Sequence, residues 1–304
     1  MQLEGVHHIT AITGDAQKNV DFYVGVLGLR LVKKTVNQDD PTVYHLFFAD
    51  NEGDAGSDLT FFEYPGAPRG RAGDGMIHTV GWRVASAEAL DFWAERLDDL
   101  GIESQREEEA LRFSDPEGLG HELRVSRAPD EPLVAEQPDI PAEVALQGFD
   151  GARAYASKPE ASTELFEQAL GFQRRSNGWE VRGDDRGGLY GFDPAPEERG
   201  LQGAGSVHHI AWASQIEEHE AWRDRAISGG AHPTPVIDRF YFRSIYFREP
   251  SGVLFEIATL GPGFTVDEPL ETLGEKLSLP PDYEHLREQV EPVLRPITNP
   301  RVPA

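Results

Sequence analysis

The chain has 304 residues, of which 53 are acidic and 28 are basic, and its formal net charge is −25 with a pI near 4.7. This charge repels nucleic acids and anionic membranes, so neither is expected as a partner. Cysteine is absent, which excludes disulfides, iron–sulfur clusters, thiolate metal sites and cysteine nucleophiles.

Only five of the basic residues are lysines. An acidic, lysine-poor surface favours a halophilic protein of a high-salt cytoplasm, where screening removes most of the self-repulsion, over an ordinary acidic mesophilic protein. The N-terminus shows no signal-peptide pattern, and no apolar run approaches the roughly 20 residues of a membrane span. We therefore expect a cytoplasmic protein. The sequence leaves the oligomeric state open, a homo-oligomer included.

A strand motif with two adjacent histidines occurs twice. Residues 206–212 read Ser-Val-His-His-Ile-Ala-Trp, and residues 5–10 read Gly-Val-His-His-Ile-Thr. After the N-terminal copy, a helix is predicted to begin at Asp15 and to end before Gly28. Three extended segments follow this helix, at 29–36, 44–49 and 59–64.

The same order of strand, helix and strands recurs three more times along the chain. The predicted fold class is therefore α+β, with four tandem βαβββ modules forming two half-open barrels with helices outside. The predicted domains are residues 1–127 (N-terminal pair of modules), 128–146 (Pro- and Glu-rich linker), 147–260 (C-terminal pair of modules) and 261–304 (C-terminal tail).

Strand alternation separates the two histidines of each pair. His8 and His209 have small or polar neighbours on their face, which is typical of a cavity lining, and they are the candidate metal ligands. His7 and His208 share a face with large apolar residues and are predicted to pack under helices. For these two, packing is at least as good an interpretation as orienting the ligands or relaying protons.

The last hairpin supplies a third candidate ligand. A turn over residues 249–252 sets a register that places Tyr246 opposite Glu256, with both facing the cavity. A carboxylate buried there needs a cation. With His8 and His209 it forms a two-histidine, one-carboxylate set, which leaves open positions for substrate and O₂ as in non-haem Fe(II) oxygenases. Mn(II), Zn(II) or Ni(II) would suit the same donors.

Module two, which begins with a predicted strand at 77–82 and ends with a predicted hairpin at 111–125, offers an internal comparison. Glu122 falls at the position of Glu256, Thr79 falls at that of His209, and Arg112 stands opposite Glu122. An Arg112–Glu122 ion pair is therefore predicted there, and no metal. The metal site is expected to join the two ends of the chain.

Arg239 and Tyr246 are the next candidates. A cationic donor and a phenolic O–H near a metal can bind a phenolate and stabilise charge on an oxygen as an aromatic ring opens. A salt bridge from Arg239 to Asp238 or another surface acid is an equally good interpretation. The predicted direction of Tyr246 toward the cavity favours a functional role.

With these residues assembled, the chain resembles the vicinal oxygen chelate superfamily of glyoxalases, bleomycin-resistance proteins and extradiol dioxygenases. Within that superfamily it is similar to ring-cleaving dioxygenases that act on hydroquinones. The similarity covers nearly the whole chain. The stretches that carry it are 6–10, 22–37, 59–62, 206–212, Arg239, Tyr246, 255–256 and 273–277.

The resemblance implies an enzyme that opens a hydroquinone-type aromatic diol with O₂ and incorporates both oxygen atoms. It implies Fe(II), with Mn(II) as a substitute, held by His8, His209 and Glu256. The catalytic residues that it implies around the metal are His7, Thr10, His208, Arg239 and Tyr246.

Two other classes stay open. A glyoxalase-type lyase or isomerase would take a fourth protein ligand from the paired module, for which Glu63 is the candidate. A protein that binds an aromatic compound without turnover would carry no stoichiometric metal.

Overall fold

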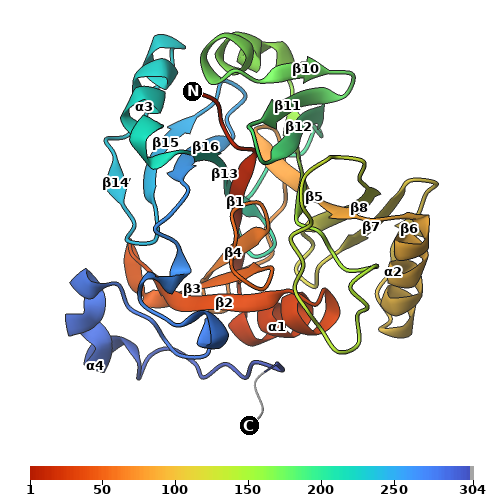
Figure 1. The fold of residues 1–304 in the computed structure, drawn as a ribbon, viewed down its shortest axis with the longest axis vertical. Coiled ribbons are helices and arrows are strands. Elements are labelled where there is room, and N and C mark those ends of the chain that lie inside the picture. The colour runs from red at the N-terminus through yellow and green to blue at the C-terminus, as the bar shows by residue number, and fades with distance from the viewer. Residues whose placement is uncertain (302–304) are drawn as a thin grey trace.

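The computed structural model describes residues 1–301, which form two eight-stranded sheets (Figure 1). The first sheet has the order β14-β15-β16-β13-β1-β4-β3-β2, and the second has the order β10-β11-β12-β9-β5-β8-β7-β6. The expected α+β class, with tandem modules curled into half-open barrels, is confirmed.

The strands of the first sheet are β1 (Val6–Thr13), β2 (Arg30–Asn37), β3 (Asp40–Ala49), β4 (Asp58–Glu63), β13 (Val207–Ser214), β14 (Ile237–Asp238), β15 (Arg243–Arg248) and β16 (Leu254–Thr259). Those of the second are β5 (Met76–Val84), β6 (Ser104–Arg106), β7 (Ala110–Ser114), β8 (Gly120–Val125), β9 (Phe149–Ala156), β10 (Gln173–Arg175), β11 (Gly178–Arg182) and β12 (Gly187–Pro194).

Each sheet joins one module from each half of the chain. β1 pairs antiparallel with β13, and β5 pairs antiparallel with β9. Figure 1 accordingly shows the red N-terminal strands beside the blue C-terminal ones, with the middle of the chain on the other side. The stretches 1–127 and 147–260 are therefore not the two barrels. The division of the sequence at 128–146 and at 261 stays a prediction about the order of modules along the chain.

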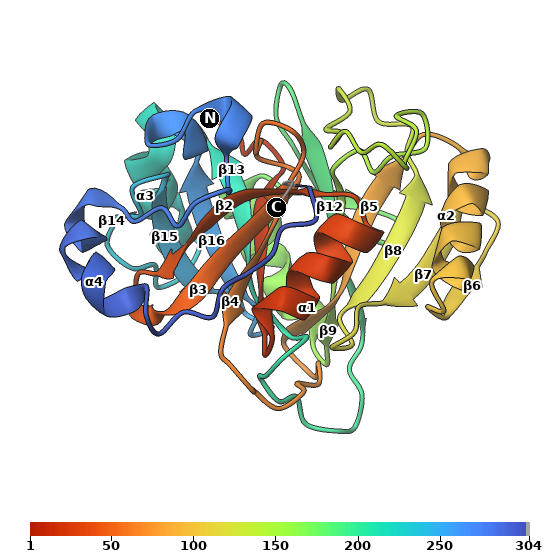
Figure 2. The same cartoon turned by 90° about the horizontal axis from the view of Figure 1, so that it is seen from below.

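The helices are short, and one lies between the two sheets. In Figure 2, α1 crosses the middle of the molecule, whereas α2 covers the outer side of the second sheet. The predicted N-cap is confirmed, because the Asp15 side chain accepts from the Lys18 amide at 3.1 Å. Ser86 caps α2 in the same way and accepts from the Ala89 amide at 3.3 Å. No helix within residues 1–301 is both long and apolar enough to cross a membrane. The helical segments of the modules are α1 (Ala16–Val20), η1 (Asp21–Val26), α2 (Ala87–Asp99), η2 (Pro159–Ser162), η3 (Leu165–Leu170), η4 (Ile216–Glu218) and α3 (His219–Ser228).

The C-terminal tail packs against the first barrel. Its helical segments are η5 (Phe264–Val266), η6 (Leu270–Thr272), η7 (Pro281–Leu286) and α4 (Arg287–Val290). The fully buried ammonium of Lys33 on β2 bonds the carboxylates of Asp267, at 2.8 Å, and Glu268. Phe264 joins an apolar cluster with Phe47 and Phe242. The tail therefore supports strand β2 and the residues that continue from it toward the cavity.

Along β16, successive side chains point alternately into the main apolar core and into the barrel interior. Phe255 and Ile257 enter the core, while Glu256 and Ala258 face the interior, as the hairpin register predicts. The ring of Phe255 stacks on Phe166 with 5.5 Å between centroids and meets Trp212 at 5.4 Å. Packing on one face of this strand thus holds the opposite face in register.

Replacing Phe255 by alanine is expected to lower the free energy of unfolding by about 3–5 kcal/mol, because it leaves a cavity among aromatic rings. The matched control is Ile227→Ala, an exposed position on α3, where the change should stay within about 0.5 kcal/mol. Urea unfolding at one salt concentration measures both variants. Equal stabilities for the two would contradict the core assignment.

A buried chain of hydrogen bonds links the helical segment η1 to the second sheet. The indole N–H of Trp82 donates to His121 Nδ1 at 3.1 Å, His121 Nε2 lies 3.1 Å from the Tyr23 hydroxyl, and that hydroxyl donates to Asp115 at 2.9 Å. These directions require a neutral imidazole with its hydrogen on Nε2. Burial lowers the pKa of His121 to about 3.

These buried hydrogen bonds predict that the free energy of unfolding falls in acid. Unfolded, His121 binds a proton below its ordinary pKa of 6.5, whereas the folded imidazole stays neutral down to about pH 3, so stability falls as the pH drops through that window. Between pH 6.5 and 4 this group should contribute a loss of about 3 kcal/mol. We expect a shallower decline for His121→Phe than for wild type when unfolding free energies are measured at both pH values. Parallel pH profiles would refute this assignment.

Candidate metal centre

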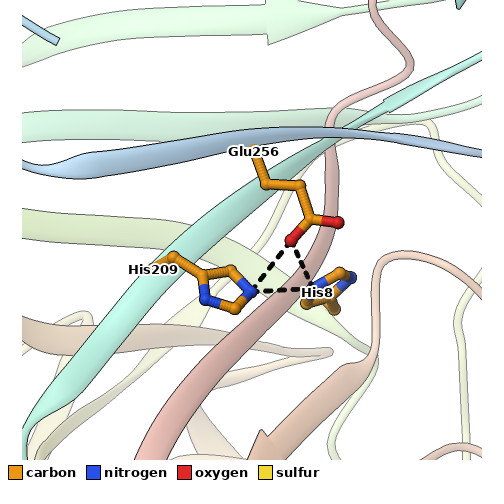
Figure 3. A group of neighbouring side chains, drawn as sticks. All are labelled: His8, His209 and Glu256. Carbon is orange, nitrogen blue, oxygen red and sulfur yellow. Dashed lines mark hydrogen bonds and ion pairs between the residues drawn. The ribbon is translucent and has the colours of Figure 1, made fainter. Parts of the chain in front are cut away.

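Three side chains from opposite ends of the chain meet inside the first barrel (Figure 3). His8 comes from β1, His209 from β13 and Glu256 from β16, and all three are buried. The Nε2 atoms of His8 and His209 lie 3.2 Å apart. Glu256 Oε2 lies 3.2 Å from His8 Nε2 and 2.9 Å from His209 Nε2. Within residues 1–301, no other group of three such side chains brings its ligand atoms this close.

The donor set fits a divalent first-row metal. Ligand atoms about 2.1 Å from one ion and at right angles to each other would be separated by about 3.0 Å, which matches the separations between these three. Glu256 Oε1 accepts from the Ser244 hydroxyl, whereas Oε2 is buried with no hydrogen-bond partner among the described residues. A cation between the three atoms would supply what this oxygen lacks.

β-Bulges shape both histidine pairs. The register between β1 and β13 skips one residue at His7 and another at His208. A bulge sets two residues opposite one and so breaks the alternation of faces. The expectation that His208 packs under helices was wrong: it is exposed and lines the cavity, with its ring 5.6 Å from that of Phe62. His7 is buried and its ring lies 5.2 Å from Phe242.

The neighbouring histidines orient the candidate ligands. His7 Nε2 lies 3.1 Å from the carbonyl oxygen of Thr259, which only accepts, so we assign the hydrogen to this nitrogen. His7 Nδ1 then accepts from His8 Nδ1 at 3.0 Å, which leaves the Nε2 lone pair of His8 facing the centre. His208 and His209 repeat the contact at 2.8 Å between their Nδ1 atoms. Burial lowers the pKa of His7 to about 3 and also lowers that of His209, so both are neutral at physiological pH.

Among residues 1–301, no fourth acidic or histidine side chain joins the cluster. Glu63 is turned away, since its carboxylate accepts from the Ala16 amide at 3.0 Å at the start of α1. The strand registers place Thr60 at the position in module one that Glu256 has in module four. The suggestion of Glu63 as a fourth ligand was therefore wrong. Thr60 instead bonds Thr10, with 2.8 Å between their hydroxyl oxygens.

Arg239 and Tyr246 lie together at the cavity. Arg239 Nε donates to the Tyr246 hydroxyl at 3.3 Å, and the guanidinium pairs with Asp39 of module one at 3.0 Å rather than with Asp238. Tyr246 stands opposite Glu256, as predicted, and its ring lies 5.8 Å from that of His209. Burial raises the pKa of Tyr246, so its phenol is protonated.

A cavity of about 440 Å³ contains the cluster, a size suited to a small aromatic molecule. One wall comes from module four and carries Arg239 and Tyr246. The other comes from module one and includes His45, a residue that the sequence analysis missed. The sequence predicted an extended segment at 44–49, which contains His45. Which face of that segment meets the cavity depends on its pairing with β4.

At the equivalent position of the second barrel, the described part of the chain forms no such cluster. The predicted ion pair is confirmed: Arg112 Nε lies 2.6 Å from the Glu122 carboxylate, which also pairs with Arg124. Thr79, at the position of His209, bonds His78 Nδ1 at 2.8 Å. Arginines here balance the charge that a metal would balance in the first barrel.

Comparisons with known proteins agree with the fold and the site. Residues 5–123 and 148–257 match the Glyoxalase/Bleomycin resistance protein/Dioxygenase superfamily, and the chain belongs to this superfamily. It is 43% identical to "Putative ring-cleaving dioxygenase MhqO" of Bacillus subtilis (strain 168), over 96% of each chain. It is 33% identical to the chlorohydroquinone/hydroquinone 1,2-dioxygenase of Sphingobium indicum, over 99% of this chain and 98% of that one.

A solved structure supports the same relationship. The crystal structure of a Bacillus subtilis protein described as a putative dioxygenase superposes with a TM-score of 0.91 at 41% identity, and 99% of each chain is covered. The resemblance stated from the sequence is thereby confirmed.

The cluster predicts the metal content of variants. His8→Ala, His209→Ala and Glu256→Gln should each weaken metal binding by about 100-fold or more, because each removes a donor from a three-donor set. Glu122→Gln, at the matching position of module two, is the control and should keep full occupancy. Elemental analysis after dialysis against Fe(II), Mn(II) or Zn(II) measures the bound metal. Full occupancy in the Glu256 variant would rule out the site.

Proposed function

We propose that this chain is a non-haem Fe(II)-dependent, extradiol-type dioxygenase that opens the ring of hydroquinone-type aromatic diols with O₂, with Mn(II) able to replace Fe(II). The observation that carries the proposal is a buried set of three ligand atoms in an aromatic-lined cavity, with Thr60 instead of a fourth ligand. When bound, the metal would acidify a substrate hydroxyl and relay electrons from the diol to O₂. Relatives named as ring-cleaving dioxygenases support this class.

The module-four wall would handle charge on the substrate. The guanidinium of Arg239 favours an ionised hydroxyl and offsets negative charge that develops on oxygen as the ring opens. The Tyr246 phenol, protonated and bonded to Arg239, can donate its hydrogen to that oxygen. The remainder of the cavity wall includes five further aromatic rings, which would limit the water around the reacting ring. They belong to Phe47, Phe62, Tyr64, Tyr241 and Phe242.

Three further residues would support the centre. His7 and His208 hold the outer nitrogens of His8 and His209, which keeps both rings aimed at one point. His208, at the open side of the cavity, can also exchange a proton with the substrate. Thr10 fixes the Thr60 hydroxyl beside the cluster.

The charge of −25 and the five lysines support one further part of the proposal, a working environment of salt-rich cytoplasm. High salt would screen the repulsion between acidic side chains. Activity should then rise from low to molar KCl, and inhibition by molar KCl would count against this part.

Oxygen consumption tests the activity. Protein loaded anaerobically with Fe(II) and mixed with methylhydroquinone should take up one O₂ per diol when air is admitted, and both atoms of ¹⁸O₂ should appear in the product. Tyr246→Phe should lower kcat by about 100-fold with unchanged metal content, and Glu122→Gln should match wild type. An oxygen electrode and mass spectrometry give both readouts.

The competing classes predict different results in the same assay. Turnover of a glutathione hemithioacetal without O₂ uptake would indicate a lyase or isomerase. Tight binding of hydroquinones with no metal would indicate a binding protein. No O₂ uptake across hydroquinones and catechols would remove the dioxygenase proposal.

A further inference from the structure

Two polar side chains on the module-one wall have no role in the proposed reaction. Thr35 on β2 and His45 on β3 stand directly opposite each other in the strand register, and both line the cavity. Neither belongs to the metal cluster. The surrounding wall includes the aromatic rings of Phe47 and Phe62.

Thr35 has an unused hydroxyl. The residue is 2% exposed, and no described residue hydrogen-bonds to its Oγ1. Buried hydroxyls in proteins nearly always have a partner, because leaving one unpaired forfeits its hydration. The hydroxyl oxygen itself is covered, but Thr35 lines the cavity, and rotation about its Cα–Cβ bond would turn the hydroxyl toward a bound molecule.

His45 has one ring nitrogen engaged and one free. Its Nε2 lies 2.9 Å from the Thr60 hydroxyl, while no described residue hydrogen-bonds to Nδ1. The ring lies 4.0 Å from Phe47 and 4.4 Å from Phe62, which fixes its plane. Burial, followed by the nearby His8 and His209, lowers the pKa of His45 well below its usual value. The imidazole is therefore neutral and can pair one donor and one acceptor.

The sheet order sets this pair apart from Arg239 and Tyr246. The metal cluster comes from the middle strands β1, β13 and β16, whereas β2 and β3 end the sheet on one side and β14 and β15 end it on the other. Because the sheet curls around the cavity, its two ends form facing walls. A ring held at the cluster by one oxygen lies between these walls.

We propose that Thr35 Oγ1 and His45 Nδ1 form a recognition pair for the second hydroxyl of the diol, the one that does not bind the metal. The Thr35 hydroxyl donates to the substrate oxygen, and that hydroxyl donates to His45 Nδ1. This inference rests on the proposed function and narrows its substrate class. The two oxygens of catechol are adjacent and both reach the metal, whereas those of a para-diol lie on opposite sides of the ring. The pair therefore selects para-diols.

Equilibrium binding under nitrogen tests the pair without turnover. Calorimetry on the Fe(II)-loaded protein compares hydroquinone with 4-methylphenol, in which a methyl group replaces the second hydroxyl. We expect wild type to prefer hydroquinone by about 10-fold or more, since a site built to bond a hydroxyl rejects the analogue that lacks it. Thr35→Val, which keeps the side-chain shape, and His45→Phe should each reduce the preference to about twofold or less. Their affinity for 4-methylphenol should change little.

Thr42→Val is the matched control, since this exposed threonine on β3 bonds only Asp40 and should leave the preference intact. Circular dichroism and metal content confirm folding. No preference in wild type, or a preference that survives both cavity variants, would overturn the recognition pair. Oxygen uptake by the same wild-type protein reports separately on the proposed function, so the two failures can be told apart.

Discussion

A carboxylate buried inside the first barrel governs the rest of the site. The Glu256 carboxylate is fully buried, and the Nε2 atoms of His8 and His209 face its Oε2. An ionised carboxylate in such surroundings needs a cation to offset the loss of hydration. The pairing of β1 with β13 meets this need, because it brings the N-terminal histidine beside a hairpin near the other end of the chain.

The second barrel meets the same electrostatic need in another way. Its strands bulge at His78 and Asp150, the positions that correspond to His7 and His208. The carboxylate persists as Glu122, but arginines from neighbouring strand positions pair with it. The backbone plan is thus shared by both barrels. The choice of cation, guanidinium or metal, rests on a few side chains.

In the proposed reaction, the two walls of the cavity have different roles. Arg239, held by Asp39 across the mouth, and Tyr246 present a positive charge and a phenolic hydrogen from one side. Thr35 and His45 present a hydroxyl and a neutral imidazole from the other. The C-terminal tail supports the second wall, since its carboxylates bond Lys33, two residues before Thr35 on the same strand. If both proposals hold, charge chemistry and substrate selection lie on opposite modules.

Local rules allowed much of the site to be predicted from the sequence. The turn at residues 249–252 places Tyr246 opposite Glu256, because turn chemistry fixes hairpin register over a few residues. The duplicated histidine pair marked β1 and β13 as equivalent strands. The Arg112–Glu122 ion pair was predicted by aligning module two with module four.

Only the tertiary structure decided which groups share the cavity. The bulge that turns His208 into it, the placement of Thr60 where Glu63 had been suggested, and the meeting of Thr35 with His45 all depend on pairing between strands. A shift of one residue in such pairing moves every side chain to the other face. The sequence alone determined the donors and their hairpin. The register between distant strands, which no local pattern encodes, determined what surrounds them.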